Sequence, residues 1–207
     1  MFAVATVSKY RETDQGTDLV IHVQNHLKEM IEDKYIRTIE CRFDDGRHIS
    51  NDQRKKCYAM FKDIAEYTGD VPEYTKHLMK ALHIANTGCN YFSLHDCSMD
   101  LAREFINTMI DFALEHGIQL SELGIDRTDD IGKYLWYCLK HKKCAVCGVP
   151  GEIHHVDTIG MGNDRNTVDD SNYRKICLCR AHHTIAHSKG MPRFEKSYKV
   201  YGIVFKS

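Results

Sequence analysis

Two groups of cysteine and histidine residues near the C-terminus constrain this sequence more than any other feature. Both are rich in the sulfur and imidazole ligands that proteins use to bind zinc and other transition metals. Their members are Cys144, Cys147, His154, His155, Cys179, His182, His183 and His187. Because a single tetrahedral ion takes only four such ligands, the sequence predicts two separate metal sites.

Four of these residues have the spacing of a structural zinc site: Cys144, Cys147, Cys179 and His182. A turn between the first two cysteines, with Gly148 at the bend, lets both sulfur atoms face one ion. We therefore expect one structural Zn²⁺. Cys177 is an alternative ligand, because on an extended segment it would face the same side as Cys179.

The other histidines predict a second metal site, which would be catalytic. His183 and His187 are four residues apart and would share one face of a helix over 180–188. Segment 152–157 reads as a strand, on which neighbouring side chains face opposite ways, so His154 can turn to the metal while His155 serves proton transfer. We expect His154, His183 and His187 to bind one divalent ion (Mn²⁺, Mg²⁺, Ni²⁺ or Zn²⁺).

Charge is distributed unevenly along the chain, although its formal net value is −1. Residues 1–126 carry a net charge of −7 and residues 127–207 carry +6, so a phosphate backbone would prefer the C-terminal part. No apolar run is long enough for a membrane span, and the first residues lack the pattern of a secretory signal. Nine cysteines without such a signal indicate a cytoplasmic location, where paired cysteines usually bind metals.

The remaining patterns predict an α+β fold. Segments 2–8, 19–23 and 35–43 read as strands of a small antiparallel sheet, with a short helix over 25–33. Three helices are expected over 50–68, 72–87 and 98–116, each bounded by typical capping residues. The second of these is predicted to bury Tyr74, Leu78, Leu82 and Ala85.

The domain boundaries follow from these patterns. Residues 1–120 are expected to form the N-terminal domain, with its sheet and several helices. Residues 121–140 would be a linker and connecting helix, because 121–128 is polar. Residues 141–207 would form the zinc-stabilised C-terminal domain.

Residues 140–190 resemble the HNH endonucleases, whose fold is called ββα-metal, and look most like a phage-encoded group of HNH nucleases. The resemblance rests on Glu152–His155, on Gly160–Asn166 and on Leu178–His187. It implies that His155 is the general base that activates water. It also implies that the catalytic ion is bound by His154, His183 and His187.

The family's structural asparagine is matched less closely. Asn172 is the nearest candidate for this catalytic-site residue, with Asn166 as an alternative. In the family that asparagine usually stands about five residues before the cysteine that matches Cys179, and Arg174 occupies this place here. The chain departs from the family pattern at that position.

Residues 1–120 resemble the Orf/NinB family of phage recombination mediators. The resemblance rests on the segments Ser50–Arg54 and Tyr58–Ala65 and on the helix that follows over 99–117. It implies binding of single-stranded DNA, contact with a host single-strand-binding protein, and a homodimer.

Together these features predict a phage recombination-associated DNA endonuclease, cytoplasmic in an infected bacterial host, that acts on single-stranded, gapped or branched DNA. The basic residues expected to contact DNA are Arg165, Arg180, Lys175, Arg54, Lys55 and Lys56. The alternative is a non-catalytic, zinc-stabilised DNA-binding recombination mediator, which would bind one ion per chain. A third interpretation treats both clusters as structural zinc sites of a phage assembly or interaction protein.

Overall fold

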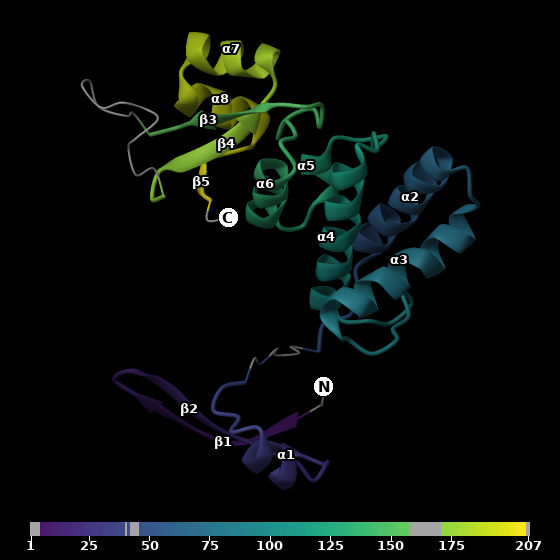
Figure 1. Cartoon of the computed structure of the whole chain (residues 1–207), viewed down its shortest axis with the longest axis vertical. Coiled ribbons are helices and arrows are strands. Elements are labelled where there is room, and N and C mark those ends of the chain that lie inside the picture. The colour runs from purple at the N-terminus through teal and green to yellow at the C-terminus, as the bar shows by residue number, and fades with distance from the viewer. Residues whose placement is uncertain (1–4, 40, 42–45, 158–170, 206–207) are drawn as a thin grey trace.

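The computed structural model describes residues 5–39, 41, 46–157 and 171–205 (Figure 1). Within these ranges the chain is of mixed α and β class, as predicted. The helices are α1 (Lys28–Asp33), α2 (Asn51–Thr68), α3 (Pro72–Thr87), α4 (Met99–His116), α5 (Gly124–Arg127), α6 (Ile131–Lys140), α7 (Arg180–Lys189) and α8 (Met191–Tyr198). The strands are β1 (Ala5–Thr13), β2 (Gly16–Val23), β3 (Glu152–His155), β4 (Arg174–Leu178) and β5 (Ile203–Val204).

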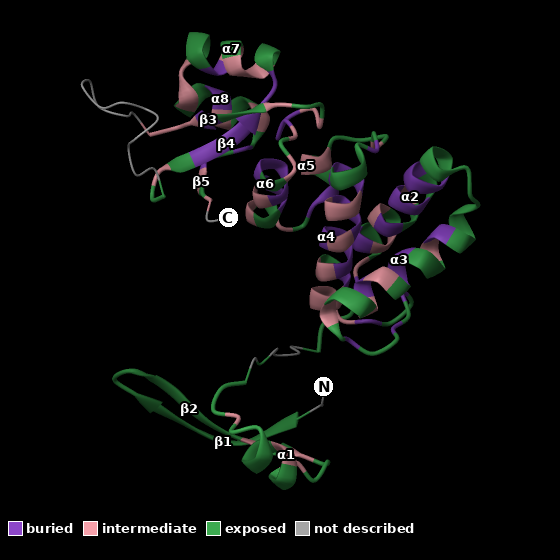
Figure 2. Ribbon diagram, in the orientation of Figure 1, coloured by how far each residue is buried: buried purple, intermediate pink, exposed green. Residues whose placement is uncertain are grey.

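The N-terminal sheet is a two-stranded antiparallel ribbon of β1 and β2. Both strands are exposed along nearly all their length (Figure 2). The prediction of a strand over 35–43 is wrong for residues 35–39 and 41, which the structure describes and which are not in a strand. Tyr35 instead ends the turn after α1 with a positive φ of 49°, a backbone conformation that does not continue into an extended strand.

Helices α2, α3 and α4 form the body that follows this ribbon, and their boundaries confirm the capping pattern. The Gln53 backbone N–H donates to Ser50 Oγ over 3.1 Å, and the Ser50 N–H donates back to Gln53 Oε1 over 3.1 Å. Gly69 ends α2 in the left-handed conformation, with φ 78°. Phe61 of α2 packs against Phe105 of α4.

Helix α3 buries a different face from the one expected. Its buried residues are Thr75, Met79, Lys80 and His83, whereas Tyr74 and Leu78 are exposed. Burial of Lys80 and His83 is tolerated because each side chain is hydrogen-bonded. Lys80 Nζ donates to the Phe92 carbonyl over 2.9 Å, and His83 Nδ1 lies 2.7 Å from Thr108 Oγ1.

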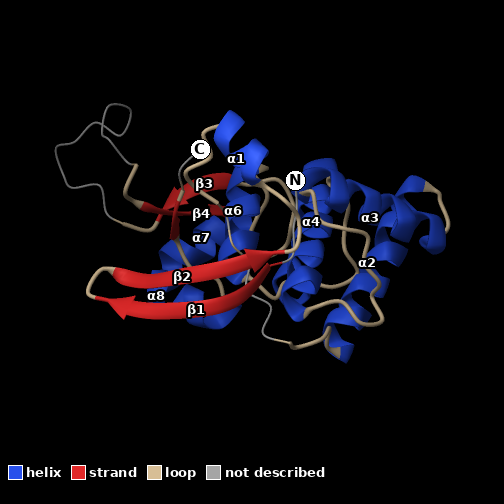
Figure 3. Ribbon diagram, turned by 90° about the horizontal axis from the view of Figure 1, so that it is seen from below, coloured by secondary structure: helices blue, strands red, loops and turns tan. Residues whose placement is uncertain are grey.

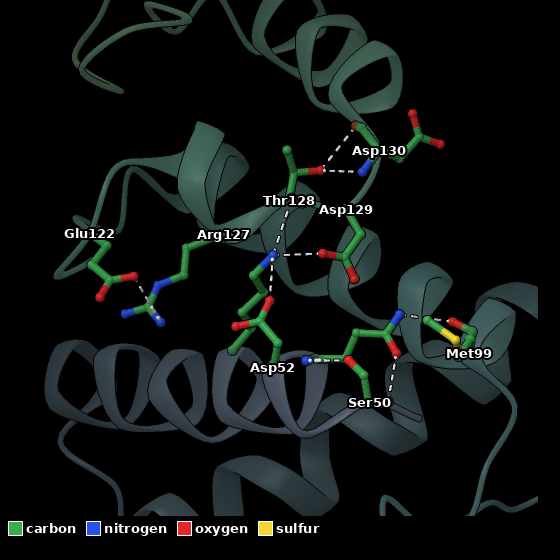
Figure 4. Close-up of polar contacts among 10 residues, drawn as sticks. Ser50, Asp52, Met99, Glu122, Arg127, Thr128, Asp129 and Asp130 are labelled. Carbon is green, nitrogen blue, oxygen red and sulfur yellow. Dashed lines mark hydrogen bonds and ion pairs between the residues drawn. The ribbon is translucent and has the colours of Figure 1, made fainter. Parts of the chain in front are cut away.

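The polar segment 121–128 contains α5 and is packed against the helical body. Arg127 is buried; its Nη2 donates to Ser121 Oγ over 2.8 Å and lies 3.7 Å from Asp63 Oδ2 of α2. Its Nη1 pairs with Glu122 at 3.4 Å. Figure 4 shows Arg127 and Glu122 and the chain that continues from them past Thr128 to Asp130, the N-cap of α6.

The C-terminal sheet has the strand order β3-β4-β5 and is antiparallel. Seen from below in Figure 3, β3 and β4 lie beside α6 and α7. His154 pairs with Ile176 and His155 with Lys175 across β3 and β4. The buried apolar residues form one cluster that extends from Ile49 of the helical body to Val200 beyond α8. Within the described part of the chain, none of the helices is both long and apolar enough to cross a bilayer.

Candidate metal centres and active site

The first cluster joins two parts of the C-terminal region. Cys144 and Cys147 lie in a tight turn after α6, where the Gly148 N–H donates to the Cys144 carbonyl over 2.8 Å. Gly148 has φ 73°, a conformation that costs glycine little. Cys179 is the N-cap of α7, and His182 lies in its first turn. The cluster therefore connects the turn before β3 to the start of α7.

The distances within this cluster fit a tetrahedral zinc ion. His182 Nδ1 lies 3.4, 3.5 and 3.2 Å from the sulfur atoms of Cys144, Cys147 and Cys179. The sulfur atoms of Cys147 and Cys179 are 3.8 Å apart. Zinc bonds of about 2.3 Å to sulfur and about 2.0 Å to nitrogen give tetrahedral edges of about 3.8 Å between sulfurs and about 3.5 Å between sulfur and nitrogen.

Two further observations bear on which cysteines could hold zinc. Burial raises the pKa of Cys179, but hydrogen bonds from the His182 backbone N–H and from the Cys147 thiol outweigh burial and lower it. This favours the thiolate, the form that binds metals. Cys177 is fully buried on β4 and is not a member of the cluster.

The second cluster brings together His154 of β3 with His183 and His187 of α7. Ligand nitrogens of the three rings lie within 4.8 Å of one another, and the Nε2 atoms of His183 and His187 are 3.2 Å apart. The ring centroids are separated by 4.7 to 4.9 Å. Nitrogens bound at about 2.1 Å to one ion lie about 3.0–3.4 Å apart, so the rings fit a shared metal.

The electrostatics of this cluster favour the neutral form of two of its rings, those of His154 and His183. Burial, with smaller contributions from the His183 and His187 rings, lowers the pKa of His154 to about 4. Burial also lowers the pKa of His183, and His187 and Arg180 add to that effect. Because a metal-bound imidazole must be neutral, both rings are ready to bind a metal near pH 7. Three histidines leave positions of an ion open to water or phosphate oxygen.

His155 is the residue after His154 and is half-buried. As a neighbour on the strand, it faces the opposite side of β3 from His154. It lies opposite Lys175 in the register of β3 and β4, and Lys175 is 8 % exposed. Antiparallel partners share one face of the sheet. The side chain of Lys175 is therefore on the same face as His155 and not on the face that carries His154.

Of the two predicted asparagines, only Asn172 lies in the part of the chain that the structure describes. Asn172 is exposed in the turn that precedes β4, and its role stays a prediction. Asn166 and the expected DNA contact Arg165 lie outside the described residues. Arg174, at the place of the family's asparagine, pairs with Asp157 at 2.7 Å. Sequence reasoning did not identify Asp157, although a carboxylate two residues after the His154-His155 pair was a signal that could have drawn attention to it.

The other basic residues expected at DNA occupy different surroundings. Arg180 is exposed at the first position of α7, and Lys55 is exposed on α2. Arg54 donates to the carbonyls of Leu94 and His95, each over 2.9 Å. Lys56 donates to Asp129 Oδ1 over 2.6 Å. These contacts link α2 to neighbouring loops, and a DNA role for the four residues stays a prediction.

Comparison with known proteins adds one match. A family model described as "Putative HNHc nuclease" matches residues 20–207, which is most of the chain. No curated protein matches the chain, and no solved structure does. The match includes both histidine and cysteine clusters as well as the helical body before them. The chain therefore belongs to the HNHc nuclease family.

Proposed function

We propose that this protein is a metal-dependent DNA endonuclease that hydrolyses phosphodiester bonds. The observation that carries the proposal is the convergence of His154, His183 and His187 from a strand and a helix, with His155 directly after the first of them. The proposed fold of β3, β4 and α7 is the ββα-metal arrangement, with one structural Zn²⁺ held by the cysteine-rich cluster.

Each proposed residue has one task in the reaction. His155 removes a proton from the attacking water as general base. His154, His183 and His187 would hold a divalent ion, which supplies Lewis-acid stabilisation of charge on the phosphate oxygens. Arg180, exposed one helical turn before His183, would hold a neighbouring phosphate of the backbone. We also propose DNA contacts for Lys175 and Arg165. Asn172 is proposed to stabilise the loop around the site.

The N-terminal part is proposed to select the DNA. Its resemblance to Orf/NinB mediators supports a recombination-associated phage protein that binds single-stranded, gapped or branched DNA, forms a homodimer and contacts a host single-strand-binding protein. Lys55 is the best placed of its predicted DNA contacts, because Arg54 and Lys56 are already engaged within the chain. The proposed location is the bacterial cytoplasm.

The donor set also bears on the identity of the catalytic ion. Imidazole nitrogens suit Mn²⁺, Ni²⁺ and Zn²⁺ better than Mg²⁺, which prefers oxygen ligands. We expect chelated protein that has been reloaded with zinc at its structural site to cleave DNA best after addition of Mn²⁺ or Ni²⁺. Full activity with Mg²⁺ alone would contradict joint binding by the three histidines.

The decisive experiment compares His155→Ala with wild-type protein on supercoiled, gapped and branched DNA. His155→Ala should keep both ions and its DNA affinity but lose at least about 100-fold in cleavage rate, a typical loss for a general base. His22→Ala, an exposed histidine on β2, is the matched control and should cleave normally. Undiminished cleavage by His155→Ala would refute its assignment as the base.

Metal content separates this function from the alternative mediator. Two ions per chain after reconstitution would support a nuclease, and DNA binding with one tightly held zinc and no cleavage would support the mediator. Retention of both ions through strong chelation, with no cleavage, would instead indicate two structural sites. The measurement uses the full chain, because its core is continuous from the helical body to the C-terminal region.

A further inference from the structure

Asp157 and Arg174 form a contact of several hydrogen bonds close to His155 in the chain. Arg174 Nη2 donates to Asp157 Oδ1 over 2.7 Å, and Arg174 Nε donates to the same oxygen over 3.0 Å. The Arg174 backbone N–H donates to Asp157 Oδ2 over 2.7 Å. One carboxylate thus accepts from both the guanidinium and the main chain of one residue. Both side chains are partly exposed to solvent, so the ion pair alone would contribute little. The main-chain hydrogen bond and the several guanidinium donors together fix the position of the carboxylate.

This contact lies where β3 and β4 end together. Asp157 is two residues after His155, and between them the Val156 N–H donates to the Arg174 carbonyl over 2.9 Å. Arg174 therefore holds the main chain after His155 through its carbonyl and holds Asp157 through its N–H and side chain. The strand that carries His155 cannot shift along β4 without breaking these bonds.

The segment before β5 also packs against this strand end. A Cβ atom on Gly202 would lie 2.5 Å from Val156 Cγ2 and 3.2 Å from Arg174 Cβ, so Gly202 packs directly on both residues. Arg174 also pairs with Val204 in the sheet register. The main chain next to His155 is thus restrained both by hydrogen bonds to Arg174 and by close packing of Gly202.

We propose that Asp157 and Arg174 are positioning residues for His155, a refinement that rests on the proposed nuclease function. They hold the end of β3 so that the His155 imidazole meets the attacking water in one orientation. Because small displacements of a catalytic group cost large factors in rate, this pair contributes to turnover without touching the substrate. The Arg174 guanidinium is hydrogen-bonded to Asp157, and in this proposal it does not bind a phosphate.

A positioning role and a phosphate-binding role for Arg174 predict different results for Asp157→Asn. If the pair positions His155, this variant loses kcat by about tenfold or more, while KM for DNA stays within about twofold. If Arg174 were a phosphate contact restrained by Asp157, removing the carboxylate would tighten DNA binding and leave kcat unchanged. That second result would overturn the proposal.

Two further variants make the test specific. Arg174→Lys keeps the positive charge but lacks the planar fork, so it should lose kcat in the same way. Asp18→Asn is the matched control, because Asp18 also pairs with a cross-strand arginine, Arg11, at 2.8 Å. The control variant should keep wild-type kcat. Equal losses in Asp157→Asn and Asp18→Asn would contradict a role specific to the site.

A readout that does not depend on cleavage separates this inference from the proposed function. In nitrogen-15 histidine spectra of the full-length, metal-loaded protein, the His155 signal should shift in Asp157→Asn and stay in place in Asp18→Asn. Bound metal and melting temperature serve as folding controls. If wild-type protein does not cleave DNA, the proposed function fails. If it cleaves and Asp157→Asn has wild-type kcat and an unchanged His155 signal, the positioning role fails.

Discussion

The Nε2 atoms of His183 and His187 lie 3.2 Å apart on successive turns of α7, pointing toward the same place as His154 of β3. We predict that His183→Ala loses one of two bound ions and retains the zinc of the cysteine cluster. Removing one of three ligands lowers affinity sharply, whereas the neighbouring site keeps all four of its own. Elemental analysis of dialysed protein measures this. Loss of both ions, or of neither, would contradict separate sites.

The cysteine cluster should determine the stability of the C-terminal region. Cys179→Ala is expected to lose zinc and more than about 3 kcal/mol of stability, since structural zinc binding contributes on the order of 10 kcal/mol. Cys177→Ala is the control; it should keep zinc and cost only about 1 kcal/mol through a small cavity. Zinc content and urea unfolding give both quantities. Loss of zinc from Cys177→Ala with retention in Cys179→Ala would reverse the ligand assignment.

Arg127 should anchor segment 121–128 to the helical body. Arg127→Met leaves the buried Asp63 carboxylate without its cation, so we expect a loss of about 3 kcal/mol. Arg103→Met is the control, because Arg103 forms an exposed pair with Asp100 and should lose under about 1 kcal/mol. Urea unfolding of both variants measures the difference. Similar small losses would show that the buried network is energetically unimportant.

Two glycines should respond to alanine in opposite directions. A Cβ on Gly124 would lie 2.6 Å from the ring of the buried Tyr134, so Gly124→Ala should destabilise the fold by about 1–3 kcal/mol through overpacking. A Cβ on Gly132, in α6, would meet its nearest neighbour at 3.5 Å. Gly132→Ala should therefore stabilise by up to about 1 kcal/mol through helix propensity. Differential scanning calorimetry would reveal the contrast, and melting shifts of the same sign would contradict it.

Cys57 should contribute to alkaline destabilisation. Burial raises the pKa of this thiol from 9.0 to about 12. Between these values the unfolded chain has lost a proton that the folded protein retains, so stability is intact below pH 9 and falls as the pH rises. The expected loss between pH 8 and pH 10 is about 1 kcal/mol. Cys57→Ala should be less stable at pH 8 but lose less over this interval in urea titrations; a steeper loss in the variant would contradict this sign.

Local chemistry predicted much of the helical structure and the metal clusters. The capping box of Ser50 and Gln53 gave the start of α2 correctly, since a cap is satisfied by residues three apart. The zinc spacing and the i,i+4 pair on α7 likewise grouped residues that the structure brings together. These features depend on short-range geometry, which the sequence contains directly.

The features that were missed depend on contacts between distant segments. The buried face of α3 includes Lys80 and His83 because Phe92 and Thr108 provide partners, and no pattern within the helix indicates those partners. The pairing of Asp157 with Arg174 spans a gap of 17 residues. Such tertiary contacts override the apolar periodicity on which sequence reasoning depends.

His182 and His183 are consecutive residues of α7 that belong to different metal clusters. Zinc at the first would orient the opening turn of the helix, and that turn sets the direction in which His183 projects. If the proposed function holds, zinc depletion would impair cleavage even when the second divalent ion is abundant, because the turn that orients His183 would lose its zinc. The proposed nuclease activity would therefore depend on two different metal ions, whose ligands His182 and His183 are joined by one peptide bond.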